Sequence, residues 1–492
     1  MIALLLLLPI IGSLIILPIQ EDSIKNQNRI KNVSLITSLI TLLVSIFLWL
    51  EFDSNTTQYQ FVYEFNELSF CHFNVGIDSL SLYFVLMTTF ITPVALLSSW
   101  NLPNSLSGNS PVGIKFFFIA LLILETLQIA LFVVLDLLLF YVFFESVLPL
   151  LYILIVVYGS GVNKIRSANL LFLYTLAGSL PMLLSILTIY SNIGSTDFTI
   201  ISLNEISLQA QKVLWLGFFI AFAVKTPLFP FHIWLPRAHS DAPLAASILL
   251  AATVLKFATY GYIRVLINFL PDATNYFSPL IQTIAIVTLI YASLTTIVQQ
   301  DTKALIAYSS VCHMAVVILG LFSNTIVGIE GAILLALAHT FVSPALFICV
   351  GGILYSRYHT RNIAYFRGLV NIMPLFTILF FVFILANTGI PLTLNWLGEQ
   401  MSLIGIFERS PVTAVLGATG ILFSAIYSIF MYNRISYGTL SPYLKPMKDI
   451  DRREYFLLLS LLIPTVLLGI FPNVVLDTLH VGVTTLLYNT PI

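Results

Sequence analysis

Charged residues are scarce in this chain of 492 residues: they make up 9% of it, whereas 59% of the residues are hydrophobic. Soluble domains carry about 25% charged residues, so the composition excludes an ordinary water-soluble protein. The net charge of −1 excludes the strongly basic surface that nucleic-acid binding requires. The sequence is therefore that of an integral membrane protein with almost no soluble part.

Cysteine and the common cofactor motifs are also missing. Cys71, Cys312 and Cys349 lie far apart, so they form neither a disulfide framework nor a CxxC pair. Cys312 stands directly before His313, a spacing that does not suit zinc. The chain contains no GxGxxG, Walker or HExxH motif. We therefore expect this chain to hold no metal or cofactor.

Long apolar runs are abundant, and a helix needs about 20 apolar residues to cross a bilayer. About fourteen segments meet this condition. The first begins at Met1 without the basic region or cleavage site of a signal peptide, so we expect it to be a membrane helix. The segments are 1–18, 33–51, 79–100, 115–134, 136–158, 167–190, 212–228, 242–266, 277–299, 302–322, 327–355, 369–406, 411–433 and 455–477.

Lysines and arginines outside these segments or near their ends, such as Lys303, are counted with the loops, and they are distributed unevenly. Most lie in loops that follow odd-numbered segments, and the opposite side holds only Lys212, Arg264 and Arg409. The positive-inside rule then places the basic loops on the inner side and both termini on the outer side. The whole chain, 1–492, is predicted to be one all-α membrane domain.

Two segments are predicted to be broken helices. Pro227 and Pro230 interrupt the seventh, and Pro391 follows a glycine within the twelfth; each proline removes a backbone donor. Lys225-Thr-Pro-Leu-Phe-Pro-Phe-His-Ile-Trp-Leu resembles Asn387-Thr-Gly-Ile-Pro-Leu-Thr-Leu-Asn-Trp-Leu, with threonine and Trp-Leu at the same spacing. Because the copies lie five helices apart, the second is inverted relative to the first, as in inverted-repeat transporters.

Six ionisable side chains fall at membrane depth, where a charged residue costs about 2.5–3.5 kcal/mol on an insertion scale. Such residues therefore need partners or water, and they mark ion or proton pathways. The proline-broken helices supply that water, because freed carbonyls must find hydrogen-bond partners. The candidates are Glu145, Lys225, Lys256, His313, His339 and Glu399.

This mixture of acids, lysines and imidazoles is suited to moving protons. Histidine titrates near neutral pH and can relay protons through water. A lysine and a glutamate that approach each other in oil titrate as a coupled pair, so Glu145 can modulate Lys225. The simpler alternatives stay open: a static Glu145–Lys225 ion pair, histidines that only satisfy hydrogen bonds, and a structural polar pocket around Glu399.

Several of these residues stand in motifs that resemble a known family. The motifs are Phe-Phe-Glu145-Ser-Val-Leu-Pro, Val-Lys225-Thr-Pro, His232-Ile-Trp-Leu-Pro-Arg-Ala-His-Ser-Asp-Ala-Pro, Leu-Lys256-Phe-Ala-Thr-Tyr-Gly and Lys303-Ala-Leu-Ile-Ala-Tyr-Ser-Ser-Val-Cys-His313. They look like the antiporter-like subunits of proton-pumping NADH:quinone oxidoreductase, respiratory complex I. Other branches of the family resemble each other in having lysine at the position of Glu399. The glutamate therefore favours the subunit 4 branch.

The resemblance implies a fold of fourteen helices with two inverted five-helix repeats, at 115–266 and 277–433. It implies a proton relay through the six candidates, and it places flavin, iron–sulfur clusters and ubiquinone in partner subunits. The implied partners are the other membrane-arm subunits, including two antiporter-like ones, together with lipids, water and protons. The implied location is the mitochondrial inner membrane, with the basic loops in the matrix and both termini in the intermembrane space.

Two other functions stay possible from the sequence. Multi-subunit cation/proton antiporters share the Glu145 and Lys225 motifs, and a passive membrane scaffold is the simplest reading of an apolar chain. Glu125 in the fourth segment and Arg237 receive no role. Arg237 stands where relatives often have an acidic residue, and Glu125 lies outside the shared motifs.

Overall fold

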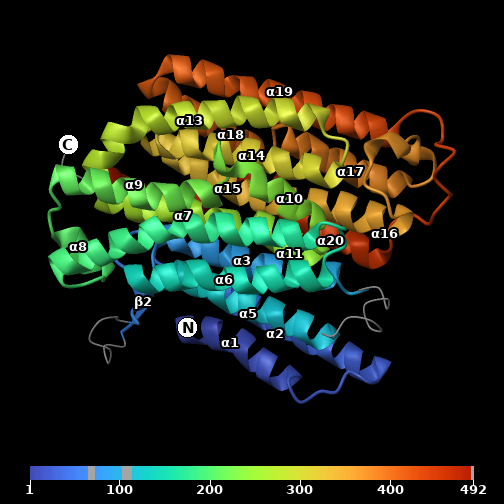
Figure 1. Cartoon of the computed structure of the whole chain (residues 1–492), viewed down its shortest axis with the longest axis horizontal. Helices are drawn as coiled ribbons and strands as arrows, with labels where there is room; N and C mark the ends of the chain where they lie inside the picture. Colours follow the sequence, from blue (N-terminus) through green and yellow to red (C-terminus); the bar gives the residue numbers. More distant parts are fainter. Residues whose placement is uncertain (65–72, 102–112, 489–492) are drawn as a thin grey trace.

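The computed structural model describes residues 1–64, 73–101 and 113–488, so Cys71 lies outside the described residues. Within them, twelve helices are long and apolar enough to cross a membrane, and two shorter apolar helices accompany them. Figure 1 shows these helices side by side with nearly parallel axes. The all-α membrane class that the composition predicts is therefore confirmed.

Ten of the long helices are continuous: α2 (Ile24–Glu51), α3 (Ser79–Ser98), α5 (Ile114–Val133), α6 (Leu137–Tyr158), α7 (Lys164–Ile193), α9 (Leu208–Lys225), α13 (Pro271–Val298), α14 (Thr302–Leu321), α19 (Pro411–Ser436) and α20 (Arg452–Ile470). Two are composite. Leu244–Ile267 joins α11 (Leu244–Leu249), η2 (Leu250–Val254), α12 (Leu255–Gly261) and η3 (Tyr262–Ile267), and Ile326–Tyr358 joins α15 (Ile326–Phe347), η4 (Ile348–Leu354) and α16 (Tyr355–Tyr358).

The shorter elements are α1 (Ile2–Ile16), α8 (Phe198–Leu203), α10 (Trp234–Asp241), α17 (Pro374–Asn387), α18 (Leu394–Arg409) and α21 (Asn473–Tyr488), with short turns η1 (Phe231–Ile233), η5 (Ile363–Tyr365) and η6 (Leu369–Asn371). Strands β1 (Gln60–Tyr63) and β2 (Val75–Ile77) pair antiparallel. In Figure 1 both chain ends lie toward the end of the bundle that carries β2, opposite α16.

Both predicted helix breaks are present. In the seventh segment α9 ends at Lys225, just before Pro227, and α10 follows beyond the segment; the twelfth segment divides into α17 and α18 on either side of Pro391. A threonine caps the first half in each case, Thr226 for α9 and Thr388 for α17. The carbonyl of Val224 accepts a hydrogen bond from the Trp234 indole at 2.9 Å, so one group freed by the first break finds a partner inside the protein.

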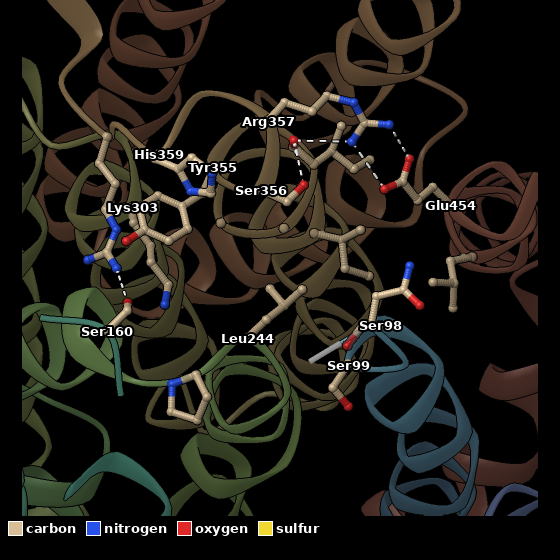
Figure 2. Close-up of a pocket in the computed structure, with 18 of the residues that line it drawn as sticks. Ser98, Ser99, Ser160, Leu244, Lys303, Tyr355, Ser356, Arg357, His359 and Glu454 are labelled. Atoms are coloured by element: carbon tan, nitrogen blue, oxygen red, sulfur yellow. Dashed lines mark hydrogen bonds and ion pairs between the residues drawn. The ribbon is translucent and has the colours of Figure 1, made fainter. Parts of the chain in front are cut away.

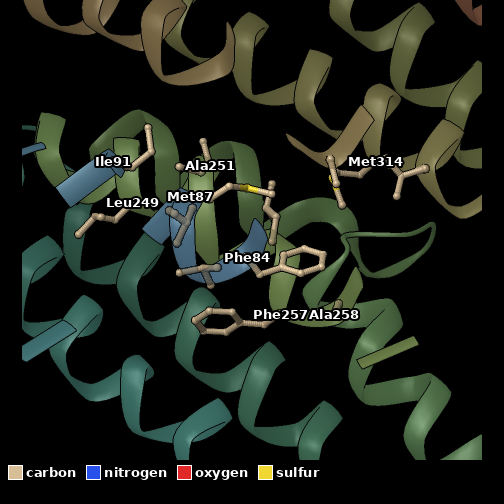
Figure 3. Close-up of a cluster of buried hydrophobic side chains, with 14 of the residues drawn as sticks. Phe84, Met87, Ile91, Leu249, Ala251, Phe257, Ala258 and Met314 are labelled. Atoms are coloured by element: carbon tan, nitrogen blue, oxygen red, sulfur yellow. The ribbon is translucent and has the colours of Figure 1, made fainter. Parts of the chain in front are cut away.

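Helix α3 packs in the middle of the molecule against both composite and continuous helices. Figure 3 shows Phe84, Met87 and Ile91 of α3 beside Leu249, Ala251, Phe257 and Ala258 of the first composite helix, with Met314 of α14 nearby. All of these side chains are buried. This apolar packing joins α3 to the first composite helix, which carries Lys256.

Arg264 and Lys303 correct the sequence prediction, which placed them in loops. Each lies inside a membrane-spanning helix and is buried. Arg264 forms an ion pair with Asp78, the N-cap residue of α3, at 2.6 Å. Burial alone would raise the pKa of Asp78, but the Arg264 guanidinium outweighs it and holds the pKa below its ordinary value. The pair ties the first composite helix to the start of α3.

Candidate functional site

Lys256 and His339 meet between the two composite helices. The Lys256 ammonium lies 2.8 Å from Nδ1 of His339 and donates to the Ala251 carbonyl at 2.7 Å. Ala251 belongs to the π-helical turn η2. Such turns displace carbonyls from the regular ladder and recur at functional sites. The local backbone therefore supplies an acceptor for the lysine in the middle of the bilayer.

His313 connects α14 to the broken twelfth segment. Its Nδ1 lies 3.1 Å from Oε1 of Glu399, and its Nε2 lies 3.1 Å from Oδ1 of Asn387. Asn387 in turn donates to the Ser428 hydroxyl at 2.9 Å. The two imidazole nitrogens thus bridge α17 and α18, which lie on either side of the break.

The break also makes space for Glu399. Gly389 has a φ of +72°, and a Cβ at this position would come within 2.6 Å of Oε2 of Glu399. A backbone in this region strongly favours glycine. Gly389 therefore permits both the turn between α17 and α18 and the position of the carboxylate.

The two histidines complete a short row of ionisable groups. The ring centroids of His313 and His339 are 6.0 Å apart. Nε2 of His339 has no partner among the described residues, and a buried polar atom of this kind is normally satisfied by water. The row therefore runs from Lys256 through His339 and His313 to Glu399, and every member is at most 3% exposed. We call it the central row.

Lys225 lies beside the central row without joining it. Its ammonium donates to the Phe144 carbonyl at 3.2 Å and lies 4.2 Å from the centroid of the Phe144 ring. The ring of Phe257, the residue after Lys256, is 6.0 Å away. Aromatic faces attract cations, so this lysine is held by a carbonyl and two rings at the end of α9.

Glu145 is only half buried, and it does not form the static ion pair with Lys225 that the sequence left open as an alternative. No carboxylate oxygen lies within 4.0 Å of the Lys225 ammonium among the described residues. Glu145 interacts with Lys225 electrostatically at longer range and with the Ser179 hydroxyl. The pairing of Glu145 with Lys225 stays a prediction about another state of the protein.

Two residues in the recognised motifs received no role from the sequence. His239 is fully buried, stacks on Phe347 with a centroid distance of 4.6 Å and interacts electrostatically with Lys303 and Lys256. Lys303 donates to the Ala242 carbonyl at 2.7 Å. Lys303 lies directly after a loop, so the sequence did not predict that it is buried. Sequence alone does not show which segments cover the start of a helix.

Lys303 lies in the wall of a cavity of about 920 Å³. Figure 2 shows its side chain entering this space below Tyr355 and His359, across from Arg357 and Glu454. The cavity lies at the end of the bundle that carries the basic loops, where α3 and α6 end and α11 begins. The cavity therefore places a large space, lined by charged and apolar residues, next to Lys303.

Glu125 and Arg237 stand apart from this arrangement. Glu125 is fully buried in α5, where its carboxyl interacts with the Thr41 hydroxyl of α2 at 2.7 Å. Arg237 is exposed. Neither contacts the central row in the hydrogen bonds and ion pairs of the described residues. The absence of a sequence-based role for either is consistent with these positions.

Chemically, the central row offers alternating proton donors and acceptors in an apolar surrounding. Each ring nitrogen can donate or accept, depending on the tautomer. The row contains two carboxylate oxygens at one end and an ammonium at the other. Among the described residues no cluster of three or more potential metal ligands occurs. The geometry favours proton movement over the binding of a bulky solute.

Comparisons with known proteins agree on one family. The family model described as "NADH:quinone oxidoreductase/Mrp antiporter, TM" matches residues 134–424. NADH-ubiquinone oxidoreductase chain 4 of Mycosarcoma maydis is 58% identical over 99% of this chain and 100% of its own length. Chain 4 of Arabidopsis thaliana is 47% identical over 98% of this chain and 96% of its own.

Solved structures share the fold over the full chain. A chain of respiratory complex I from Thermus thermophilus with bound NADH superposes with a TM-score of 0.89 at 26% identity, covering 100% of both chains. A chain of the Mrp complex from Dietzia sp. DQ12-45-1b gives a TM-score of 0.85 at 17% identity, covering 99% of this chain and 97% of its own. The second likeness, at this identity, concerns the fold alone.

Proposed function

The chain belongs to the NADH-ubiquinone oxidoreductase chain 4 family, and on this premise we propose that protons cross it through the central row. The chain is a proton-translocating, antiporter-like membrane subunit of respiratory complex I. Lys256 is the central proton-carrying group, His339 and His313 connect it through water, and Glu399 is the group at the far end.

One observation carries this proposal. Four buried ionisable groups from four helical segments converge in a row whose direct contacts are 2.8 and 3.1 Å, with one gap between two imidazoles. Buried charges in a membrane protein cost free energy unless they are paired. The stability of a helix does not require ionisable groups. The convergence of four such groups from segments far apart in sequence therefore supports a role in proton movement.

Glu145 and Lys225 are proposed as the modulating pair beside this row. Their present separation leaves Lys225 on the Phe144 carbonyl and ring. Movement of α6 or of the end of α9 would change the distance between carboxylate and ammonium, and with it the proton affinity of Lys225. Lys225 in turn faces the ring next to Lys256, so its charge acts on the central row through space.

Several finer features belong to the same proposal. The two inverted repeats, 115–266 and 277–433, place the two helix breaks at corresponding positions. The basic loops face the mitochondrial matrix and both termini face the intermembrane space, as the positive-inside rule favours. Flavin, iron–sulfur clusters and ubiquinone reside in partner subunits, and the other membrane-arm subunits adjoin this chain.

The decisive experiment replaces Lys256 by methionine, which keeps the length of the side chain without its charge. We expect the assembled complex to lose proton pumping coupled to NADH:ubiquinone turnover. The matched control is Lys164→Met at the start of α7. Proton uptake into vesicles is measured together with NADH oxidation. Full proton stoichiometry in the Lys256 variant would refute the central row as the route.

A cation/proton antiporter is the alternative function, and the fold shared with the Mrp complex favours testing it. The purified complex in sodium-loaded vesicles distinguishes the two. Sodium-dependent proton flux without NADH or quinone would favour the antiporter, whereas flux that requires both substrates favours complex I pumping. A passive scaffold predicts unchanged pumping after all six candidate residues are neutralised.

A further inference from the structure

The cavity of about 920 Å³ at the basic end of the bundle has an unusual charge composition. Its lining contains two acidic side chains, and both are already engaged. Glu454 accepts two hydrogen bonds from Arg357, at 2.6 and 3.1 Å. Asp451 forms a capping box with Glu454 at the start of α20. Glu454 is therefore paired with Arg357, whereas Asp451 accepts a backbone N–H and is the one remaining acid among the cations of the described lining.

Lys303 and Arg361 are two of the cations in the cavity lining that have no carboxylate within 4.0 Å among the described residues. Lys303 is 3% exposed, and of its three ammonium donors one is used, by the Ala242 carbonyl. Arg361 donates to the Ser240 carbonyl and the Ser160 hydroxyl. Neither forms an ion pair within 4.0 Å among the described residues.

The two cations also repel each other. Arg361 acts on Lys303 as a like charge, while Asp301 and Asp241 attract it from a longer distance. The Asp301 carboxylate is held by backbone N–H groups at the start of α14, and Asp241 accepts from Ser167 at 2.5 Å. Like charges placed together in a secluded space are unfavourable unless an anion or water lies between them.

The rim extends the positive charge, and the remaining walls are apolar. Lys448 and Arg453 also line the cavity, and Nε of Arg453 is buried without a partner among the described residues. Leu244, Ile348 and Leu457 supply apolar surface. Figure 2 shows Leu244 and Ser99 on one side of the space, with Lys303 and Arg357 on others. The cavity is therefore amphipathic.

We propose that this cavity binds an anionic phosphate group, with Lys303 and Arg361 as its innermost ligands. Guanidinium and ammonium groups bind phosphate through charge-assisted hydrogen bonds. The volume of the cavity, within the range of about 300–1,000 Å³ for small-molecule sites, exceeds what an inorganic phosphate ion fills. The apolar walls and the position at the helix ends, where lipid headgroups lie, favour the headgroup of an anionic phospholipid.

This inference goes beyond the proton route and does not depend on it. The bound phosphate would neutralise Lys303 and Arg361 without taking part in the chemistry at Lys256. Its test therefore measures binding rather than pumping. A cavity without an anion would leave the pumping proposal untouched, and a failed pumping test would leave the anion site untouched.

The experiment uses the assembled complex in phosphatidylcholine vesicles that contain a photoreactive phosphatidylglycerol. After illumination, labelled peptides are mapped by mass spectrometry. We expect labels on the peptides that line the cavity, at 351–361 and 447–457. The same photoreactive group on phosphatidylcholine should label these peptides several-fold less, because its headgroup carries no net charge.

Arg361→Gln is the main variant, since glutamine can still donate to Ser240 or Ser160 and so preserve the local fold. Labelling should fall about tenfold, as expected for the loss of hydrogen bonds to a charged group. Lys448→Gln at the exposed rim is a second, milder variant, with a several-fold decrease. The matched control is Arg434→Gln, an exposed arginine outside the cavity, which should leave labelling unchanged.

Addition of inorganic phosphate distinguishes the two sources of the anion. Unchanged labelling indicates a lipid headgroup, and suppression by phosphate indicates a site for the free ion. Equal labelling by the neutral and anionic lipids would overturn the proposal. So would labelling that both cavity variants leave unchanged, or an acidic peptide of a partner subunit crosslinked in place of lipid.

Discussion

The central row and the Glu145–Lys225 region contain the same kinds of side chain but are built differently. Lys256, His339, His313 and Glu399 are buried; Lys256 contacts His339 and His313 contacts Glu399, with one gap between the two imidazoles. Glu145 is half buried and remains out of ion-pair range of Lys225. In the proposed mechanism the central row is a preassembled route and the Glu145–Lys225 region is a movable switch, because the Coulomb energy of two charges changes with the distance between them.

The largest effects should come from variants that cut the central row, in its middle or at its end. His339→Leu removes the imidazole that contacts Lys256 on one side and faces the ring of His313 on the other. Pumping by the assembled complex should fall about a hundredfold, the usual scale for loss of a proton-transfer group. Vesicle proton uptake during NADH oxidation measures it, and His359→Gln at an exposed histidine is the control. Retained pumping would mean that protons bypass both histidines.

Neutralising the separated pair should have a smaller effect. Glu145→Gln or Lys225→Ala should lower pumping about tenfold while the complex still assembles, because the charge that modulates the row is lost but the row persists. The double variant should be no worse than either single variant, since the residues act as one unit. Glu205→Gln, an exposed acid, controls for a general charge effect. Additive losses would show that the two residues act separately.

The end of the central row should tolerate a change of charge better than its removal. Glu399→Lys keeps an ionisable group beside His313, so pumping should stay within about fivefold of the unmodified complex, whereas Glu399→Ala should lose about a hundredfold. Both variants are compared by proton uptake per NADH oxidised. A lysine variant as inactive as the alanine variant would show that this position requires a carboxylate.

The smallest effect on pumping is expected at Asp78, which anchors Arg264 away from both regions. Asp78→Asn should cost about 1–3 kcal/mol of stability, as for a broken buried hydrogen bond to a charged group. Pairing lowers the pKa of Asp78 in the folded state, so the stabilisation is present at neutral pH. It is lost as the pH falls below the unfolded value of about 3.9.

Thermal unfolding of the complex against pH checks this last prediction. The difference between the original chain and the Asp78 variant should be largest near neutral pH and vanish in acid. Proton pumping at neutral pH should be unchanged in the variant. A difference that instead grows in acid would contradict the role of the Asp78–Arg264 pair.

Sequence patterns predicted the two helix breaks well, because proline and glycine act locally on the backbone. They predicted burial of Lys256, which stands far from the end of an apolar run, and of Glu399, which follows the break in the twelfth segment. They failed for Lys303 and Arg264, which lie near helix ends and are covered by distant segments. They also gave Asn387 only a place in the repeat, although its amide contacts both His313 and Ser428.

The amino-acid sequence by itself determined that the chain lies in a membrane and that the six candidate groups stand within its apolar segments, because the free energy of apolar and charged groups in lipid depends on residue type and run length. Only the tertiary structure decided which of those groups touch. Lys256 meets His339 across 83 positions, and His313 meets Glu399 across 86. Such long-range contacts depend on helix packing and on the π-helical turn at Ala251. No local sequence pattern specifies either of these features.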